Sequence, residues 1–183
     1  MLRFTLPTAA DAQRVLSWRR QERVTRAMFS DVAPDLARHT AWLLAGTERQ
    51  DYRHWLIMYR DRPIGLINLQ KINRERRESG SGFYIGEDEF LRLTGVVLPH
   101  FYNWMFFDRN YRAMTAEVIA GNDEILRLHA AHGYRETALD RGRVIKNGEV
   151  FDVHHLRLER EAWLGQTAYH RYRAEFPTPG LEW

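Results

Sequence analysis

Cysteine is absent from this chain of 183 residues, and lysine occurs only twice, as Lys71 and Lys146. Without thiols the protein cannot form a disulfide, use a cysteine nucleophile or bind zinc through thiolates. Long apolar runs are also missing, since none approaches the ~18 residues that a membrane-spanning helix needs. The first residues, MLRFTLPTAADAQ, lack the apolar stretch of a secretory signal. These absences favour a soluble, cytoplasmic protein with no membrane partner.

A strong excess of charge of one sign is missing as well. The formal net charge of +3 is small beside that of a dedicated nucleic-acid-binding protein, so we expect a phosphorylated small molecule as partner and no nucleic acid. An apolar share of 44% with 13% aromatic residues is enough for one packed core. We predict one domain over residues 1–163 and a tail over 164–183 that packs on the domain or on a second copy in a homodimer.

The apolar pattern predicts a mixture of helices and strands. The first half reads as a strand at 2–6, a helix that begins with a capping box of Thr8 and Asp11, a helix over 35–46 that ends at Gly46, and a hairpin of strands 54–60 and 63–73. The second half reads as a polar connection over 73–82, a strand at 82–86, a helix over 96–109 with Pro99 in its first turn, a strand at 113–119, a helix that ends at Gly133, and a hairpin over 143–158. This mixture indicates the α/β (α+β) class.

Two polar residues lie on helix stripes that should be buried. Arg19 continues the stripe of Ala12 and Val15, and His39 shares a face with Leu43. A polar side chain in such a place is typical of a group directed into a cleft. For His39, a hydrogen-bonded core histidine remains the alternative.

The segment VIAGNDEILRLHAAHGY, residues 118–134, contains a short helix between glycines. Asn122, Ile125, Leu126 and His129 share one face of it, and we expect that face to point to the place where two central strands separate. A packed core or surface histidine is the alternative for His129. His132 is interpreted as a cation at the carboxyl end of this helix.

Other polar groups have simpler interpretations. Residues 87–89 form an acidic run that we interpret as a solvated turn, although it could accept a proton. His154 and His155 are adjacent on a strand, so their side chains point to opposite faces and cannot chelate one metal ion. No metal site is predicted.

Four stretches together resemble the GNAT superfamily of acetyl-CoA-dependent N-acetyltransferases: LPTAADAQRVLSWRR, GEDEFLRLTG, AEVIAGNDEILRLHAAHGY and KNGEVFDVHHLRLEREAW. The resemblance extends from about Leu2 to Trp163. It implies the GNAT fold, whose central sheet is mixed, mostly antiparallel, splayed between two strands and flanked by helices. It also implies an enzyme with acetyl-CoA as co-substrate and a primary amine as acceptor.

The resemblance assigns residues to the acetyl donor. A loop that leads into a helix presents free amide groups, which suits a pyrophosphate. In the family this loop has Gln or Arg, then two residues, Gly, one residue, and Gly or Ala; here Val97 stands at the last position. The residues implied for acetyl-CoA are Tyr84, Ile85, Gly86, Arg92, Leu93, Thr94, Gly95, Val96 and Asn122. His129 stands where the family usually has a tyrosine that protonates the leaving thiolate, which makes His129 the predicted general acid, with a pKa raised slightly toward neutrality.

Within the superfamily, the chain looks most like the N-acetyltransferases of pseudaminic-acid biosynthesis, which acetylate the 4-amino group of a UDP-linked 4-amino-4,6-dideoxy sugar. WRRQERVTRAMFSDVAPDLARHTAWL, GLINLQKIN and KNGEVFDVHHL carry this likeness. It implies that the nucleotide sugar contacts Arg19, Met28, Phe29, His39, Gln70 and Lys71. Two alternatives stay open: an acetyltransferase of protein N-termini, as in ribosomal-protein relatives, and a non-catalytic module that binds acyl-CoA or nucleic acid.

Overall fold

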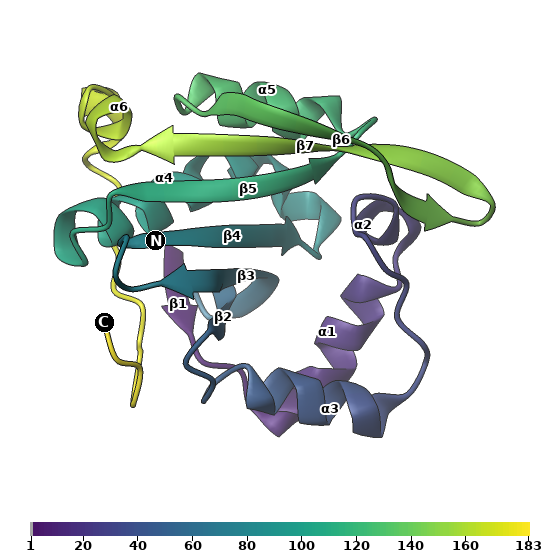
Figure 1. The fold of residues 1–183 in the computed structure, drawn as a ribbon. Coiled ribbons are helices and arrows are strands. Elements are labelled where there is room, and N and C mark those ends of the chain that lie inside the picture. The colour runs from purple at the N-terminus through teal and green to yellow at the C-terminus, as the bar shows by residue number, and fades with distance from the viewer. Residues whose placement is uncertain (1) are drawn as a thin grey trace.

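The computed structural model describes residues 2–183, which form one seven-stranded sheet in the order β1-β2-β3-β4-β5-β7-β6 (Figure 1). The strands are β1 Leu2–Thr5, β2 Tyr52–Tyr59, β3 Arg62–Asn73, β4 Glu78–Ile85, β5 Ala113–Ile119, β6 Arg135–Lys146 and β7 Glu149–Glu159. All neighbouring strands are antiparallel except β4 and β5, which are parallel. The predicted α/β class and the mixed, mostly antiparallel sheet are confirmed.

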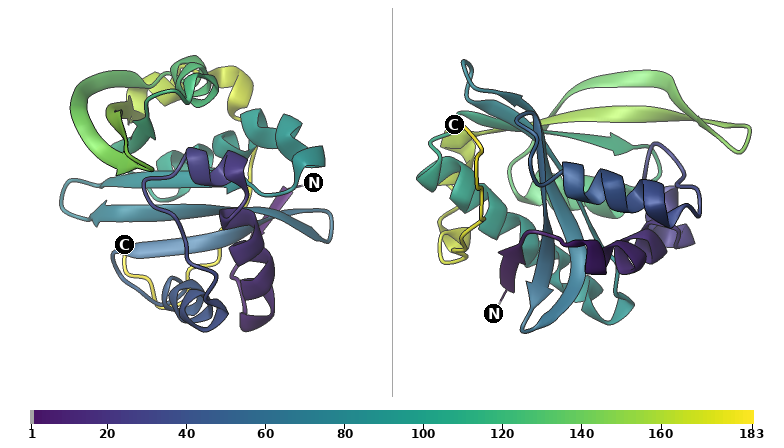
Figure 2. Two further views of the ribbon diagram at one scale, coloured as in Figure 1. Left: turned by 90° about the vertical axis from the view of Figure 1, so that its right-hand side faces the viewer. Right: turned by 90° about the horizontal axis from the view of Figure 1, so that it is seen from below.

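Helices cover both faces of the sheet. The α-helices are α1 Ala12–Arg19, α2 Glu22–Arg26, α3 Leu36–Ala45, α4 Thr94–Asn103, α5 Asp123–Ala131 and α6 Arg160–Leu164. Three short 3-10 helices are η1 Ala9–Asp11, η2 Asp88–Leu93 and η4 Thr167–Tyr169, and η3 Trp104–Asp108 is a short π-helix. Helices α1 and α3 lie side by side and pack on β2 and β3 through Leu56 and Leu66 (Figure 2). The neighbouring residues Trp55 and Ile67 point to the other face, into the main core with α4, because strand side chains alternate.

The sheet splays between β4 and β5. These strands pair only where Glu78–Gly80 lies beside Ala113–Thr115, and they diverge toward their carboxyl ends (Figure 1). Beyond that point β4 keeps β3 as its paired neighbour and β5 keeps β7. The edge of β4 from Ser81 to Ile85 therefore has no strand beside it on the β5 side. This confirms the predicted splay.

Two sequence predictions of local structure are wrong. Strand β4 begins at Glu78 and not at 82, because the Gly-Ser run pairs with β3, Leu69 facing Ser81. Pro99 lies inside α4 rather than in its first turn, since the helix already begins at Thr94. Gly46 ends α3 as predicted, with a φ of −67°. A Cβ atom on Gly46 would lie 2.2 Å from the His54 ring, so close packing explains this glycine.

The segment predicted as a tail, residues 164–183, packs on the domain. Phe176 and Leu181 belong to the main core. The Trp55 indole donates a 2.7 Å hydrogen bond to the Pro177 carbonyl, and buried Arg53 donates to the Pro179 carbonyl at 3.2 Å. These contacts join the end of the chain to β2. No helix among residues 2–183 combines the length and the apolar character that crossing a membrane requires.

Candidate active site

Two adjoining cavities lie where β4 and β5 separate. The large pocket has a volume of about 640 Å³ and lies between α1, α3 and the ends of β3 and β4. The splay pocket, of about 380 Å³, lies between β4, β5 and α5. Both are lined by Ala27, Met28, Ser81, Gly82, Phe83, Tyr84 and Glu117. Molecules bound in the two pockets would therefore meet at this shared boundary.

The splay pocket brings together several residues that the sequence assigned to acetyl-CoA. Tyr84 and Ile85 come from β4, Thr94 from the start of α4, and Asn122 from the start of α5. Gly86, Arg92, Leu93, Gly95 and Val96 do not line it. The Asn122 side chain makes no capping hydrogen bond to α5, which leaves its amide for the pocket.

The segment Arg92–Val96 is not a loop. It is the end of η2 and the first turn of α4, which run on without a break. A Cβ atom on Gly95 would meet nothing within 4 Å, so the helix start is open there, and Val97 is fully buried in the core, where its bulk does not narrow that opening. Gly86 has another role, since a Cβ atom on it would lie 2.1 Å from Trp18.

His129 is buried on the pocket-facing side of α5. Its Nδ1 lies 3.4 Å from the Tyr102 hydroxyl, and its ring centroid lies 4.6 Å from that of Tyr134. Burial, and secondarily the nearby His132, lower the pKa of His129 to about 4. The expected rise in this pKa is therefore wrong, because an apolar, aromatic surrounding disfavours the charged imidazole. At neutral pH the ring is uncharged.

His132 is not a surface cation, contrary to the sequence interpretation. It is fully buried, with its ring 5.1 Å from Tyr169 and 6.0 Å from Trp163. Burial lowers its pKa to about 4, against an opposing effect of the Gly95 carbonyl. Pro99 is the reason this carbonyl is free, because a proline has no N–H to donate to the carbonyl four residues earlier. Gly133 ends α5 with a φ of +96°, as predicted.

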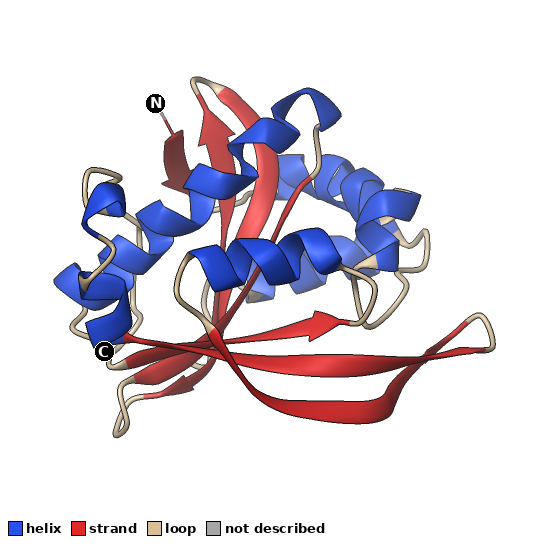
Figure 3. Ribbon diagram, turned by 90° about the horizontal axis from the view of Figure 1, so that it is seen from above, coloured by secondary structure: helices blue, strands red, loops and turns tan. Residues whose placement is uncertain are grey.

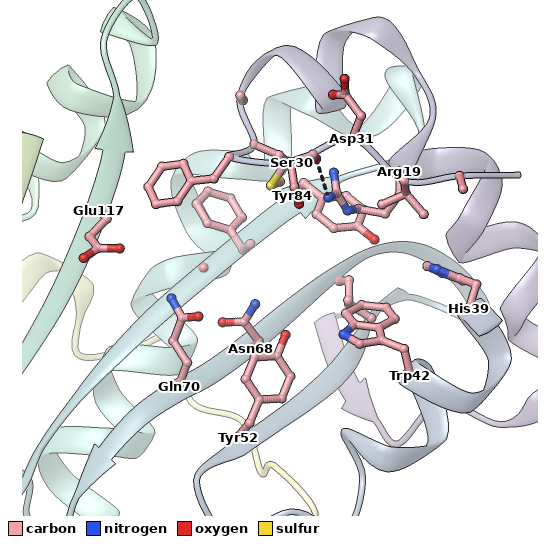
Figure 4. Close-up of a pocket in the computed structure, with 18 of the residues that line it drawn as sticks. Arg19, Ser30, Asp31, His39, Trp42, Tyr52, Asn68, Gln70, Tyr84 and Glu117 are labelled. Carbon is pink, nitrogen blue, oxygen red and sulfur yellow. Dashed lines mark hydrogen bonds between the residues drawn. The ribbon is translucent and has the colours of Figure 1, made fainter. Parts of the chain in front are cut away.

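The large pocket contains most of the residues implied for the acceptor. Arg19, Met28, Phe29, His39 and Gln70 line it (Figure 4). Lys71 does not line the pocket, and its side chain is largely exposed. Its ammonium group lies 2.6 Å from the carboxylate of Glu117, which does line the pocket. The strand is irregular there, with a φ of 53° at Lys71.

Further lining residues were not anticipated. They include Ser30, Asp31, Trp42, Tyr52 and Asn68. Asn68 could have been found from the sequence, because it shares a strand face with Gln70 two positions later. Tyr52 faces Gln70 directly across the β2–β3 hairpin. Burial raises the pKa of Tyr52 to about 12, so its hydroxyl is a neutral donor in this pocket.

The pocket wall holds buried polar atoms that lack a partner within residues 2–183. They are Nη1 of Arg19, Nε2 of His39, Oδ1 of Asn68 and the hydroxyl oxygen of Tyr84. Buried polar groups in proteins are almost always hydrogen-bonded, so four such atoms around one cavity indicate a polar ligand. Nη2 of Arg19 donates a 3.2 Å bond to the Ser30 carbonyl (Figure 4), and burial lowers the pKa of this guanidinium. Burial, together with Arg19, also lowers the pKa of His39.

Two of the three carboxylates that line the large pocket are paired with lysines. Asp31 lies 3.0 Å from the Lys146 ammonium group, and Asp35 caps α3 by accepting the Arg38 amide at 2.9 Å. Glu117 has Lys71 at 2.6 Å, besides two more distant basic groups, Arg143 and His155. Within residues 2–183, Arg19 has no carboxylate partner. Arg38 also lines the pocket and has no ion pair within residues 2–183, so Arg19 and Arg38 outweigh Asp35 and the unpaired charge of the lining is positive.

Glu117 is the carboxylate on the boundary of the two pockets, and sequence reasoning missed it. The acidic run considered instead lies outside both pockets and is neutralised: Glu87 and Glu89 pair with Arg62, and Asp88 pairs with Arg23 at 2.7 Å. Arg23 also donates to the Ile85 carbonyl at 3.0 Å and so ties α2 to the end of β4. Residues 2–183 contain no cluster of three histidine or carboxylate side chains suited to a metal ion.

A model of the acetyltransferase (GNAT) domain matches residues 4–155, across both pockets. The chain belongs to this family. It is therefore an N-acetyltransferase, and acetyl-CoA is its acetyl donor. No curated protein matches this chain in sequence.

Solved structures share the fold at low sequence identity. A spermidine N-acetyltransferase from Vibrio cholerae, in complex with CoA and spermine, superimposes with a TM-score of 0.81 at 15% identity, over 89% of this chain and 98% of that one. Mutant forms of the spermidine/spermine N-acetyltransferase from Vibrio cholerae give 0.76 at 14% identity, over 91% and 99%. A probable acetyltransferase gives 0.76 at 16%, over 88% and 94%. These likenesses show the GNAT fold of this chain.

Proposed function

We propose that this GNAT enzyme acetylates the primary amine of an anionic small molecule, with the 4-amino group of a UDP-linked 4-amino-4,6-dideoxy sugar as the leading acceptor. Acetyl-CoA occupies the splay pocket, the acceptor occupies the large pocket, and the amine meets the thioester at the shared boundary. The observation that carries the proposal is the half-buried guanidinium of Arg19, which has no carboxylate partner, whereas the Asp31 and Glu117 carboxylates of the pocket are paired with lysines.

The large pocket also suits a nucleotide. A diphosphate can take charge-assisted hydrogen bonds from Arg19, which are stronger than neutral ones. The rings of Trp42 and Phe29, 40% and 37% exposed, offer apolar surface to a base. Gln70 and Asn68 add amide groups that can pair with the polar edge of uracil or with sugar hydroxyls. Each of these groups lies on the wall of one cavity, so a single elongated acceptor can use them together.

The chemistry follows from the boundary between the pockets. Glu117 is the carboxylate placed to accept a proton from the acceptor's ammonium group, directly or through water, so that the neutral amine attacks the thioester carbonyl. Collapse of the tetrahedral species breaks the C–S bond and expels the CoA thiolate, and the attacking nitrogen releases its extra proton to that sulfur, directly or through water, to leave the neutral amide and the CoA thiol. His129 is neutral, and the Tyr102 hydroxyl beside Nδ1 leaves Nε2 for the cleft. An Nε2–H group can donate a hydrogen bond to the departing sulfur, as a preorganised donor and not as a charged acid.

A polyamine is the second candidate acceptor, because the structural neighbours include spermidine N-acetyltransferases. A polyamine needs free carboxylates for its ammonium groups. Asp31, Asp35 and Glu117 line the large pocket, but each already has a basic or backbone partner. The charge balance therefore favours the anionic acceptor.

The test is an acetyl-CoA consumption assay with three acceptors under one buffer condition: the UDP-linked 4-amino sugar, spermidine and a peptide with a free amino terminus. The unphosphorylated 4-amino sugar serves as matched control for the nucleotide part. We expect the highest kcat/KM with the UDP-sugar and a loss of most of it with the control sugar. Turnover confined to spermidine or to the peptide would overturn the proposal.

A further inference from the structure

Lys146 reaches from the tip of the β6–β7 hairpin to the wall of the large pocket. It is the last residue of β6, and the hairpin projects far beyond the rest of the sheet (Figure 3). Its ammonium group donates to the Thr25 carbonyl at 2.6 Å and the Met28 carbonyl at 3.1 Å, and it lies 3.0 Å from the Asp31 carboxylate. All three N–H donors are thus engaged, and the side chain is only 9% exposed.

The segment that Lys146 holds, residues 27–31, follows α2 and lines the large pocket. Within residues 2–183, the backbone amides from Phe29 to Val32 donate to no other backbone group. Side chains must therefore fix this segment. Arg19 binds the Ser30 carbonyl from the pocket side, and the Arg143 guanidinium lies 6.0 Å from the centre of the Phe29 ring.

Lys146 also decides the charge of this wall. Asp31 lines the large pocket and contributes a favourable field at Arg19, so its carboxylate competes with an anionic ligand for that guanidinium. The Lys146 ammonium group neutralises Asp31. The two lysines of the chain thus have the same effect, since each pairs with a carboxylate that lines the large pocket: Lys146 with Asp31 and Lys71 with Glu117.

We propose that Lys146 is a specificity-determining residue. It holds residues 27–31 in place as one wall of the acceptor pocket, and it cancels the charge of Asp31 so that the pocket selects an anionic acceptor over a cationic one. The second statement rests on the proposed function; the first does not. Lys146 acts through this wall and is a positioning residue.

The first test is hydrogen exchange of the full chain without ligands. In K146M the amides of Ala27 and Met28, which donate to the Val24 and Thr25 carbonyls at 3.1 and 3.0 Å, should exchange at least about tenfold faster, because the charge-assisted hydrogen bonds that hold this end of the segment are lost. The matched control is R141M, which removes one cation from the same hairpin, where Arg141 is 81% exposed and lies 3.6 Å from Asp152. R141M should leave the exchange of the Ala27 and Met28 amides unchanged. Unaltered exchange in K146M would overturn the holding role.

The second test is kinetic. K146M should raise the KM for the UDP-amino sugar by roughly tenfold, change the KM for acetyl-CoA less than twofold, and improve the use of spermidine relative to the sugar. D31N in the K146M background should recover part of the sugar KM, because it removes the uncompensated carboxylate. No recovery in the double variant would overturn the charge role. If the wild type does not acetylate the sugar, yet exchange accelerates in K146M, the proposed function fails and the holding role stands.

Discussion

Replacement of Arg19 by methionine tests separately what the Arg19 charge does to the stability of the fold and what it does to acceptor binding. Methionine keeps much of the side-chain volume, and the Thr25 hydroxyl can still donate to the backbone carbonyl of residue 19, as it does now at 2.7 Å. The variant loses the 3.2 Å bond to the Ser30 carbonyl and the partly desolvated guanidinium. Because this cation has no carboxylate partner, its removal relieves a burial penalty. We therefore expect the free energy of unfolding to stay equal or to rise.

The same variant should bind the acceptor poorly. A hydrogen bond to a charged group contributes about 1.5–3 kcal/mol, so the KM of the UDP-amino sugar should rise roughly 10- to 150-fold. The KM of acetyl-CoA should change little, because Arg19 lines the large pocket and not the splay pocket. This combination of retained stability and weakened acceptor binding is typical of a residue kept for its ligand.

The assay is steady-state kinetics with each substrate varied in turn, together with urea unfolding followed by circular dichroism. Arg20→Met is the matched control, since Arg20 is exposed and does not line the large pocket. It should leave both KM values near those of the wild type. A drop in stability in Arg19→Met with equal changes in both KM values would refute the reasoning, because Arg19 would then be a structural residue.

Three further predictions concern the histidines and one glycine. His129→Phe should lower kcat about 100-fold and retain acetyl-CoA affinity, as expected for the loss of one preorganised hydrogen-bond donor. Because the pKa of His129 is about 4, the pH profile of the wild-type rate should show no inflection near pH 6.5 from this imidazole. An unchanged kcat in the variant would mean that His129 is a packing residue. The pKa of His132 is about 4 in the folded protein and 6.5 as its ordinary value, so between these pH values the unfolded chain binds a proton that the folded chain does not. The contribution of this imidazole to the free energy of unfolding is therefore complete above pH 6.5 and falls by about 3 kcal/mol as the pH falls toward 4. Denaturant unfolding at pH 7 and pH 4.5 should show this loss, and His132→Gln should reduce it; a pH dependence equal to that of the wild type would contradict the buried neutral state. Gly46→Ala should destabilise the fold by about 1–3 kcal/mol through overpacking against His54, and thermal unfolding with no shift would contradict that close contact.

Local sequence pattern accounts for the ends of α5 and for several residues of the site. The turn chemistry of Gly121 and Gly133 bounded α5, and one helical face then located Asn122 and His129 on the splay pocket. Arg19 and His39 were found because a polar residue broke an apolar stripe, and both line the large pocket. Each of these inferences used the period of a single element.

Properties that depend on distant contacts could not be predicted. His132 is buried by Trp163 and Tyr169, which come from the end of the chain, so its environment is invisible in the local sequence. Glu117 lines both pockets only because β5 leaves β4 beyond Thr115. The prediction that Gln70 and Lys71 both line the acceptor pocket conflicts with strand alternation, because neighbouring residues of a strand point to opposite faces. That conflict can be seen in the sequence alone.

The pairing of Lys146 with Asp31 joins positions 115 residues apart in the sequence. Both lie in stretches that carry the family resemblance, but neither stretch indicates that they pair. The fold brings them together by extending the β6–β7 hairpin toward α2, and the compensation of charge in the large pocket follows from that placement. Net charge counted along the chain gives no indication of which carboxylates remain free.

The central claim is that the large pocket receives the anionic part of the acceptor at Arg19. Titration calorimetry with UDP, which carries the anionic part and no reactive amine, tests it most directly. We predict saturable binding of UDP to the wild type, retained when CoA saturates the splay pocket and lost in Arg19→Met. Absence of UDP binding, together with saturable binding of spermidine that CoA does not displace, would contradict the account.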